Sequence, residues 1–245
     1  MFCISRIFPI ILLLALAACA PRLMKPLPSP PPVSEAREFE TVAEKSWWAC
    51  RFKIAWPPDA APDMTVDLLL AQAVVGPILK TEGQNLLFWR FHRRAAPDDS
   101  GHQFSFLFYS DTQTLKDITE AIRQNKTVHQ ALESRIVEQA ACDADDSPRR
   151  PEISAMSDAK WSPALQKHWP FFIMGVSRLW LGLINEALSG LPPHADDFSK
   201  RLEQIREVET KINAVWYREG QHAFFHHLSA VFGYEPLLIR KEIRF

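Results

Sequence analysis

The sequence predicts an α+β fold with a small antiparallel sheet. Short segments in which apolar side chains alternate predict strands, and apolar residues three or four apart predict helices between and after them. Turn-forming residues between two of the strand segments predict a hairpin. With 245 residues, 47% of them hydrophobic, the chain is long enough to bury a sizeable core. Its net charge of −1 argues against nucleic acid as a partner.

The first half of the domain reads as strand, helix, hairpin and helix. Residues 47–56 alternate, with Trp48, Cys50 and Phe52 expected on the buried face. A helix from about residue 65 has a break near Gly76-Pro77. Strands at 86–94 and 102–110 flank the turn residues 95–101, and Leu87, Trp89 and Phe91 are expected to point inward. Helical spacing then runs from residue 112 to residue 136.

The second half is mostly helical. Pro170 begins a very apolar helix, which fits either a buried central helix or one that inserts into a membrane or binds a partner. A long helix follows at 197–231, and the alternation at 237–245 predicts a last strand. The domain, residues 46–245, thus resembles the ferredoxin-like pattern β-α-β-β-α-β, with a C-terminal helical insertion before the last strand.

The N-terminus resembles that of a bacterial lipoprotein. Arg6 precedes an apolar run, 7–16, that is too short to span a bilayer, and the run ends in Leu16-Ala17-Ala18-Cys19, which is similar to a lipobox. The resemblance implies a signal peptide at 1–18 and lipidation of Cys19. Because Ala20 is not Asp, it also implies the periplasmic face of the outer membrane. The alternative is an ordinary secretory signal with a chance cysteine.

A proline-rich tether follows the lipobox. Residues 19–45 carry six prolines between positions 21 and 32, a composition that favours polyproline II and a semi-rigid spacer. Featureless disorder is the alternative. Either state holds the domain away from the bilayer.

Two cysteines remain in the mature domain, Cys50 and Cys142. An oxidising compartment permits a bridge between them across 92 residues. Alternatively, Cys50 is a small core side chain and Cys142 is unrelated to it.

The expected sheet has a cationic face opposite its apolar one. Such a face fits an anionic glycan, a lipid headgroup or an acidic envelope protein. Covering helices, or carboxylates such as Glu242, are the alternative that would neutralise it. The residues of this candidate face are Arg51, Lys53, Arg90, His92, Arg94, Arg240 and Arg244.

Catalytic signatures are missing from the sequence. We find no glycine-rich phosphate loop, no nucleophile elbow and no zinc-protease motif, and we predict no cofactor. The best metal-like set is Glu219, His222 and His226, which share one side of the predicted helix. The alternative is a boundary face whose histidines pack or meet solvent.

The sequence therefore favours an envelope lipoprotein that binds or scaffolds. Its expected partners are the membrane, through the anchor, and an unidentified envelope molecule. A periplasmic enzyme with a histidine and carboxylate site, with or without a metal, is the competing hypothesis, and no catalytic residue can be named for it.

The lipid anchor predicts a labelling result. A fatty acid supplied to the cells should tag the protein, and Cys19→Ser should abolish both the tag and stable membrane attachment, because the acylated thiol is lost. Labelling followed by membrane fractionation measures both. An unlabelled variant that still partitions wholly with membranes would contradict the lipoprotein hypothesis.

Overall fold

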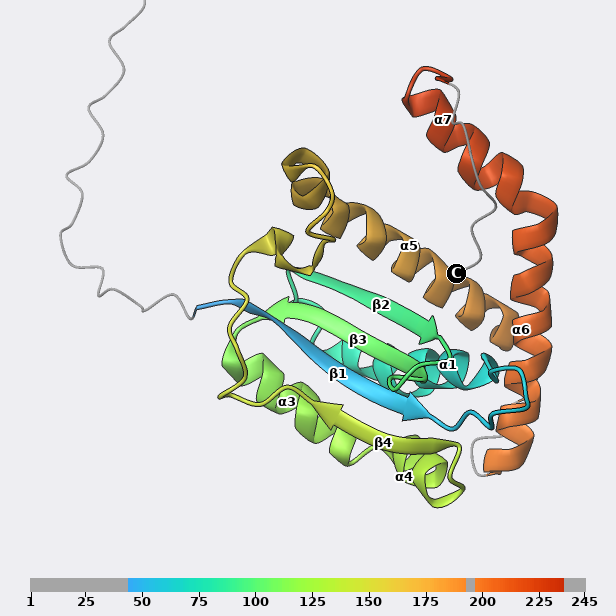
Figure 1. Ribbon diagram of the computed structural model, residues 1–245. Helices are drawn as coiled ribbons and strands as arrows, with labels where there is room; N and C mark the ends of the chain where they lie inside the picture. Colours follow the sequence, from blue (N-terminus) through green and yellow to red (C-terminus); the bar gives the residue numbers. More distant parts are fainter. Residues whose placement is uncertain (1–43, 193–196, 236–245) are drawn as a thin grey trace, which may run out of the picture. The chain divides into compact units, whose positions relative to one another are not determined.

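A four-stranded antiparallel sheet lies at the centre of the computed structural model, which describes residues 44–192 and 197–235. The strand order in the sheet is β2-β3-β1-β4, and every neighbouring pair is antiparallel (Figure 1). The strands are β1 (Ser46–Ile54), β2 (Phe88–Ala95), β3 (His102–Ser110) and β4 (Val137–Cys142).

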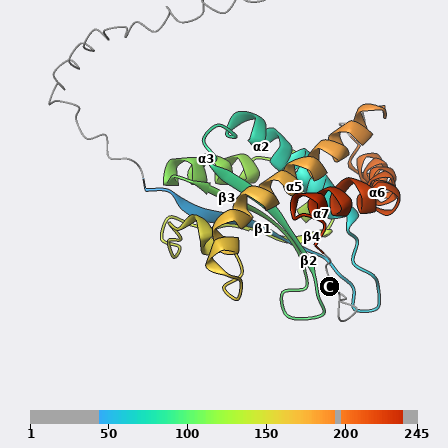
Figure 2. The same ribbon diagram turned by 90° about the horizontal axis from the view of Figure 1, so that it is seen from above.

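Helices from the first half of the domain cover one face of this sheet (Figure 2). Asp111 begins α3 as its N-cap, because its carboxylate accepts the Thr114 N–H at 2.8 Å. Asn125 begins α4 in the same way. Pro77 lies just after the π-turn η1, within a helical run that continues without a gap from α1 through η1 into α2. These helical segments are α1 (Thr65–Leu70), the π-turn η1 (Ala71–Val75), α2 (Gly76–Thr81), α3 (Thr112–Arg123) and α4 (Lys126–Glu133).

Apolar side chains are buried on both faces of the sheet. The main core joins the helices to the predicted inward face, where Phe52, Phe104 and Phe106 are fully buried. A smaller cluster on the opposite face is built around Trp47 and Tyr109. The expected burial of Trp48, Cys50, Phe52, Trp89 and Phe91 is confirmed, and Phe104, Phe106 and Phe108 of β3 are buried as well.

Leu87 departs from the predicted pattern. The expectation that it points inward is wrong, because its side chain is 49% exposed. β2 begins one residue later, at Phe88, so Leu87 lies before the strand and outside its alternation.

The fourth strand replaces part of a predicted helix. Helical spacing continued to Ile136, whereas α4 ends at Glu133 and β4 begins at Val137. Arg135 takes a left-handed backbone conformation (φ 60°) between them. A residue in this conformation commonly ends a helix, and it is usually Gly or Asn. Because the residue here is an arginine, the sequence does not indicate that the helix ends. Glu138, Gln139 and the alanines of β4 are also uncommon in strands.

The remaining helices follow β4 rather than interrupting the described sheet. They are η2 (Ile153–Met156), α5 (Pro163–Ser189), α6 (Phe198–Gly220), the π-turn η3 (Gln221–His226) and α7 (His227–Val231). The sequence analysis placed these helices before the last strand of the sheet, whereas the fourth strand of the described sheet precedes them. The strand expected at 237–245 lies outside the described residues.

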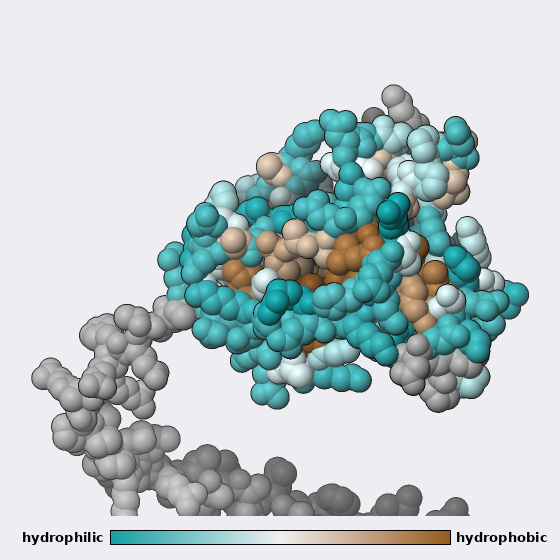
Figure 3. Space-filling view, turned by 90° about the horizontal axis from the view of Figure 1, so that it is seen from below, coloured by the Kyte–Doolittle hydropathy of each residue, from teal (hydrophilic) through white to brown (hydrophobic). Residues whose placement is uncertain are grey.

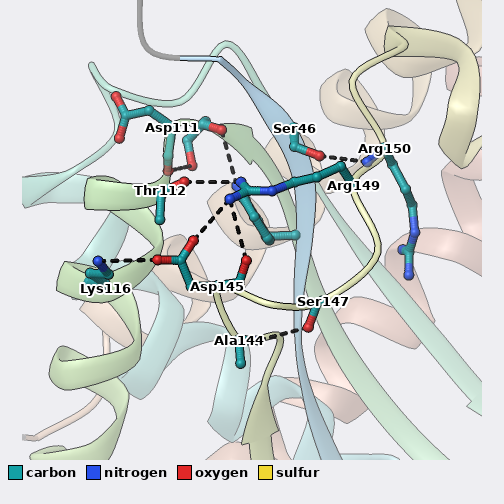
Figure 4. Close-up of polar contacts among 11 residues, drawn as sticks. Ser46, Asp111, Thr112, Lys116, Ala144, Asp145, Ser147, Arg149 and Arg150 are labelled. Carbon is teal, nitrogen blue, oxygen red and sulfur yellow. Dashed lines mark hydrogen bonds and ion pairs between the residues drawn. The ribbon is translucent and has the colours of Figure 1, made fainter.

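A polar network fixes the chain where it leaves β4 (Figure 4). Arg149 donates to Thr112 Oγ1 at 3.0 Å and to Asp145 Oδ1 at 2.9 Å, and its guanidinium lies 4.6 Å from the Trp48 ring centroid. Lys116 pairs with the same aspartate at 3.3 Å. Next along the chain, the Arg150 N–H donates to Ser46 Oγ at 2.7 Å. These contacts direct the segment before α5 across the second face of the sheet.

The two sheet edges differ. Figure 3 views the side on which β4 and α4 lie and shows a band of apolar residues along a largely hydrophilic surface. Leu132 of α4, Ala140 of β4 and Ile136 between them are only partly buried against the core. The β2 edge, by contrast, has α5 running along it (Figures 1 and 2).

A disulfide joins Cys50 to Cys142, with the two sulfur atoms bonded at 2.03 Å. The same two residues are directly paired between β1 and β4. The bridge therefore fastens the edge strand that the sequence pattern missed to the centre of the sheet.

Removing this bridge should destabilise the domain. We expect Cys50→Ala with Cys142→Ala to lower the free energy of unfolding by about 2–5 kcal/mol, because an open loop of this length restores denatured-state entropy. Urea denaturation of the exported protein measures the change, and the reduced wild-type protein is the control. Two thiols open to alkylation in the native protein would show that no bridge forms.

Candidate functional site

An apolar groove of about 890 Å³ lies in the described structure. Its walls are α5 on one side, the run from α6 through η3 to α7 on another, and β2 at its base. Cavities of roughly 300–1,000 Å³ are typical of sites for small molecules. Most of its lining residues are aromatic or aliphatic, with a few polar ones among them. The lining includes Arg90, His92, Arg93, Trp169, Phe172, Val176, Ser177, Leu179, Trp180, Trp216, Phe225, His227, Leu228 and Val231.

One side chain attaches α5 to the sheet edge. Ser177 is 4% exposed, and its Oγ accepts the Phe91 N–H of β2 at 3.1 Å. The same hydroxyl donates to the Ile173 carbonyl at 2.8 Å. Since an edge strand carries unpaired N–H groups, this contact both satisfies β2 and sets the distance between the helix and the sheet.

Much of the groove wall is apolar and exposed. Phe172, Val176 and Leu179 on α5 are 47%, 41% and 44% exposed, and Phe225 and Val231 across the groove are 54% and 82% exposed. Soluble monomers rarely leave contiguous apolar surface of this kind without a partner. Of the two alternatives for the apolar helix, a fully buried one is wrong for α5.

The length and composition of α5 would also suit a membrane span. Its most apolar window has a mean hydropathy of 1.3, and 17% of that window is buried in the domain. Ser177, Leu181 and Ile184 form the buried side of the helix against the rest of the domain. One such helix is weak evidence for a span, because core helices have the same composition.

The β2 wall supplies the groove's charge. Arg90 and Arg93 lie there with His92, and no aspartate or glutamate is among the described lining residues. Burial lowers the pKa of Arg90, and burial, then Arg90 and Arg94, lower the pKa of His92. His92 is therefore neutral at pH 7, and the arginines carry the positive charge.

A buried carboxylate positions one of these arginines. Asp67 on α1 is fully buried, with His102 Nε2 at 2.9 Å and Arg93 Nε at 3.5 Å. Arg93 also donates to the Met64 carbonyl, and its guanidinium lies 4.7 Å from the Trp180 ring centroid. The sequence analysis missed Asp67 and His102, which are 35 residues apart and share no motif.

The predicted cationic face is largely neutralised by ion pairs. Arg51 meets Asp143 at 2.6 Å, Lys53 meets Glu138 at 3.2 Å, and Arg94 pairs with Asp98. The Arg94 pair lowers the pKa of the Asp98 carboxyl to about 2. Within the described chain, Arg90 and His92 are the members of this set without a carboxylate partner. Arg240 and Arg244, together with Glu242, lie outside the described residues.

The predicted metal set does not gather into a metal-binding group. His222 and His226 stack with ring centroids 5.1 Å apart, and His227 approaches His226 at 5.3 Å. Over residues 44–192 and 197–235 no three histidine, cysteine or carboxylate side chains are placed to hold a metal ion, Glu219 included. Of these histidines, His227 lines the groove.

A second, smaller hollow of about 350 Å³ lies at the hairpin end of the sheet. Its polar lining includes Lys53, Asp98, Asp99, Glu138 and the buried His102. Carboxylates beside a histidine can move protons, but this hollow has no serine, threonine or cysteine in its described lining to act as a nucleophile.

Comparison with known proteins adds little. No family model matches the chain, and no curated protein matches it. A solved structure described as the crystal structure of TsrL is similar over 78% of this chain, with 12% sequence identity and a TM-score of 0.30. The match spans 49% of that longer chain. A likeness this weak carries no argument about fold or function.

The attachment of α5 predicts a stability difference between two serines. Ser177→Ala should lower the free energy of unfolding by about 1–3 kcal/mol, because the buried Phe91 N–H loses its acceptor. Ser189→Ala on the same helix removes an exposed hydroxyl bonded to the Glu186 carbonyl and is the control, expected within about 0.5 kcal/mol of wild type. Equal unfolding midpoints for both variants would show that Ser177 does not hold the helix.

Proposed function

We propose that this chain is a lipid-anchored protein of the bacterial envelope that binds another molecule in the apolar groove. The observation that carries the proposal is the groove itself, about 890 Å³ with aromatic and aliphatic walls open to solvent. A hollow of this size and lining suits ligand binding. The groove gives less support for catalysis, because the one hydroxyl among its described lining residues, Ser177, is already bonded to the Phe91 N–H and the Ile173 carbonyl.

The envelope location draws on two supports. One is the lipobox-like run that ends at Cys19, which lies outside the described residues. The other is the Cys50–Cys142 disulfide, since such bridges persist in the periplasm and are rare in the cytosol. We place the domain on the periplasmic face of the outer membrane, beyond a proline-rich tether.

For the fold, we propose a ferredoxin-like arrangement followed by a helical extension. The antiparallel strand order β2-β3-β1-β4 and the helices between β1 and β2 and between β3 and β4 support it. In that arrangement α5, α6 and α7 are additions that cover an edge and leave a groove.

An envelope enzyme is the second candidate. The smaller hollow favours it, because Asp98, Glu138 and His102 line one space there. The histidines that the sequence analysis proposed for such an enzyme lie elsewhere, in η3 and α7.

The binding proposal predicts a difference between two leucines of α5. Leu179 lines the groove and is 44% exposed, whereas Leu165 lies outside the lining and is 46% exposed. We expect Leu179→Lys to weaken binding of the neutral apolar dye N-phenyl-1-naphthylamine about tenfold or more, because it places a charge on the apolar wall. Leu165→Lys should bind as wild type does.

The measurement is dye fluorescence with the full chain in phosphatidylcholine nanodiscs, after subtraction of the signal from empty discs. Circular dichroism confirms that both variants are folded. Equal dye binding by wild type and Leu179→Lys would overturn the groove as the binding site.

A further inference from the structure

Arg90 has an unusual environment in the groove. Its Nη2 donates to the Met156 carbonyl at 3.4 Å, while its Nε is buried with no hydrogen-bond partner among the described residues. Two other arginines of β2 differ, because Arg93 lies beside Asp67 and Arg94 pairs with Asp98. Arg90 is half-buried, and a partly desolvated guanidinium with no carboxylate beside it favours a ligand that supplies an anion.

The rest of the groove requires an apolar ligand. The lining runs along α5 from Trp169 to Leu183, 14 positions further on, which is about 21 Å of helix. One leaflet of a bilayer core is about 15 Å thick, so an acyl chain of ordinary length fits beside this wall. The opposite wall, formed by Trp216, Phe224 and Leu228, is equally apolar.

We infer that the groove holds a single-chain amphiphile whose anionic headgroup pairs with Arg90 and whose acyl chain lies between α5 and the α6–α7 run. This inference rests on the proposed binding function and names its ligand class. Both fatty carboxylates and lysophospholipid phosphates offer that chemistry, because each presents oxygens that a guanidinium fork can bind bidentately. A helix of a partner protein or a second copy would cover the apolar walls but would pair with the half-buried Arg90 only if it presented a carboxylate there.

The test uses photoreactive C16 probes that differ only in their headgroup. A diazirine-bearing fatty acid, the matching lysophosphatidic acid and the matching neutral fatty alcohol are added to the full chain in phosphatidylcholine vesicles. Labelled peptides are then mapped by mass spectrometry. We expect labels in residues 163–189 and 198–231, with at least one anionic probe bound about 10–100-fold more tightly than the alcohol. Which anion binds more tightly identifies the headgroup source.

Substitutions on β2 test the role of the cation. Arg90→Gln should lower binding of the anionic probe to the level of the alcohol, and Arg90→Lys should restore part of the preference. Arg94→Gln, on the same strand but outside the lining, is the matched control and should leave the preference unchanged. Thermal unfolding of each variant shows that it is folded.

The outcomes separate this inference from the proposed function. If acid and alcohol label the groove equally, the groove binds apolar molecules but the anionic headgroup is refuted. If no probe labels it, the binding function fails as well. Probe-independent cross-links between two chains through α5 would assign the groove to a second copy. Labelling that appears only after the chain is shortened at Glu235 would assign it to the chain's own C-terminal segment. Either result overturns the amphiphile.

Discussion

The attachment of α5 to the edge of the sheet determines where the apolar groove lies. An antiparallel edge strand leaves N–H groups without a partner, and in β2 the Phe91 N–H finds one in Ser177. That hydroxyl lies near the centre of the long apolar helix α5. Its bond to β2 therefore sets how far the helix lies from the edge of the sheet. The run from α6 through η3 to α7 forms the wall across from α5, and the groove is the space between the two walls and β2. The short side chain of Ser177 lets α5 lie close enough to β2 for this bond to form.

The elements that the sequence predicted well are those in which local pattern and tertiary position agree. In β1 and β3, alternation of large apolar residues such as Phe52 and Phe106 matched burial against the helices. β4 could not be predicted in this way, since its pairing depends on a central neighbour and on the Cys50–Cys142 bridge. The left-handed Arg135 also ends α4 without the residue type that signals such an end.

The candidate site was less predictable than the fold. Sequence alternation placed Arg51, Arg90 and Arg94 on one face, but it could not show that Asp143 and Asp98 would neutralise two of them and leave the third. The groove itself joins β2 to helices that begin some 70 residues later, and the only sequence signal for it was the excess of apolar residues after Pro170. Burial of Asp67 beside His102 carries no sequence signal, since it depends on two side chains meeting across the core.

The disulfide divides the domain into parts that are restrained differently. The covalent loop from Cys50 to Cys142 contains β2, β3 and the helices α1 to α4, whereas α5, α6 and α7 lie outside it. The base of the groove, β2, therefore lies within the covalent loop, whereas its helical walls lie outside it and are held by non-covalent contacts. Elements of this kind open locally at a lower cost than the core. If the groove binds a ligand as proposed, exchange would proceed by partial detachment of the helical walls while the oxidised sheet stays intact, and the bridge would preserve the fold during each opening.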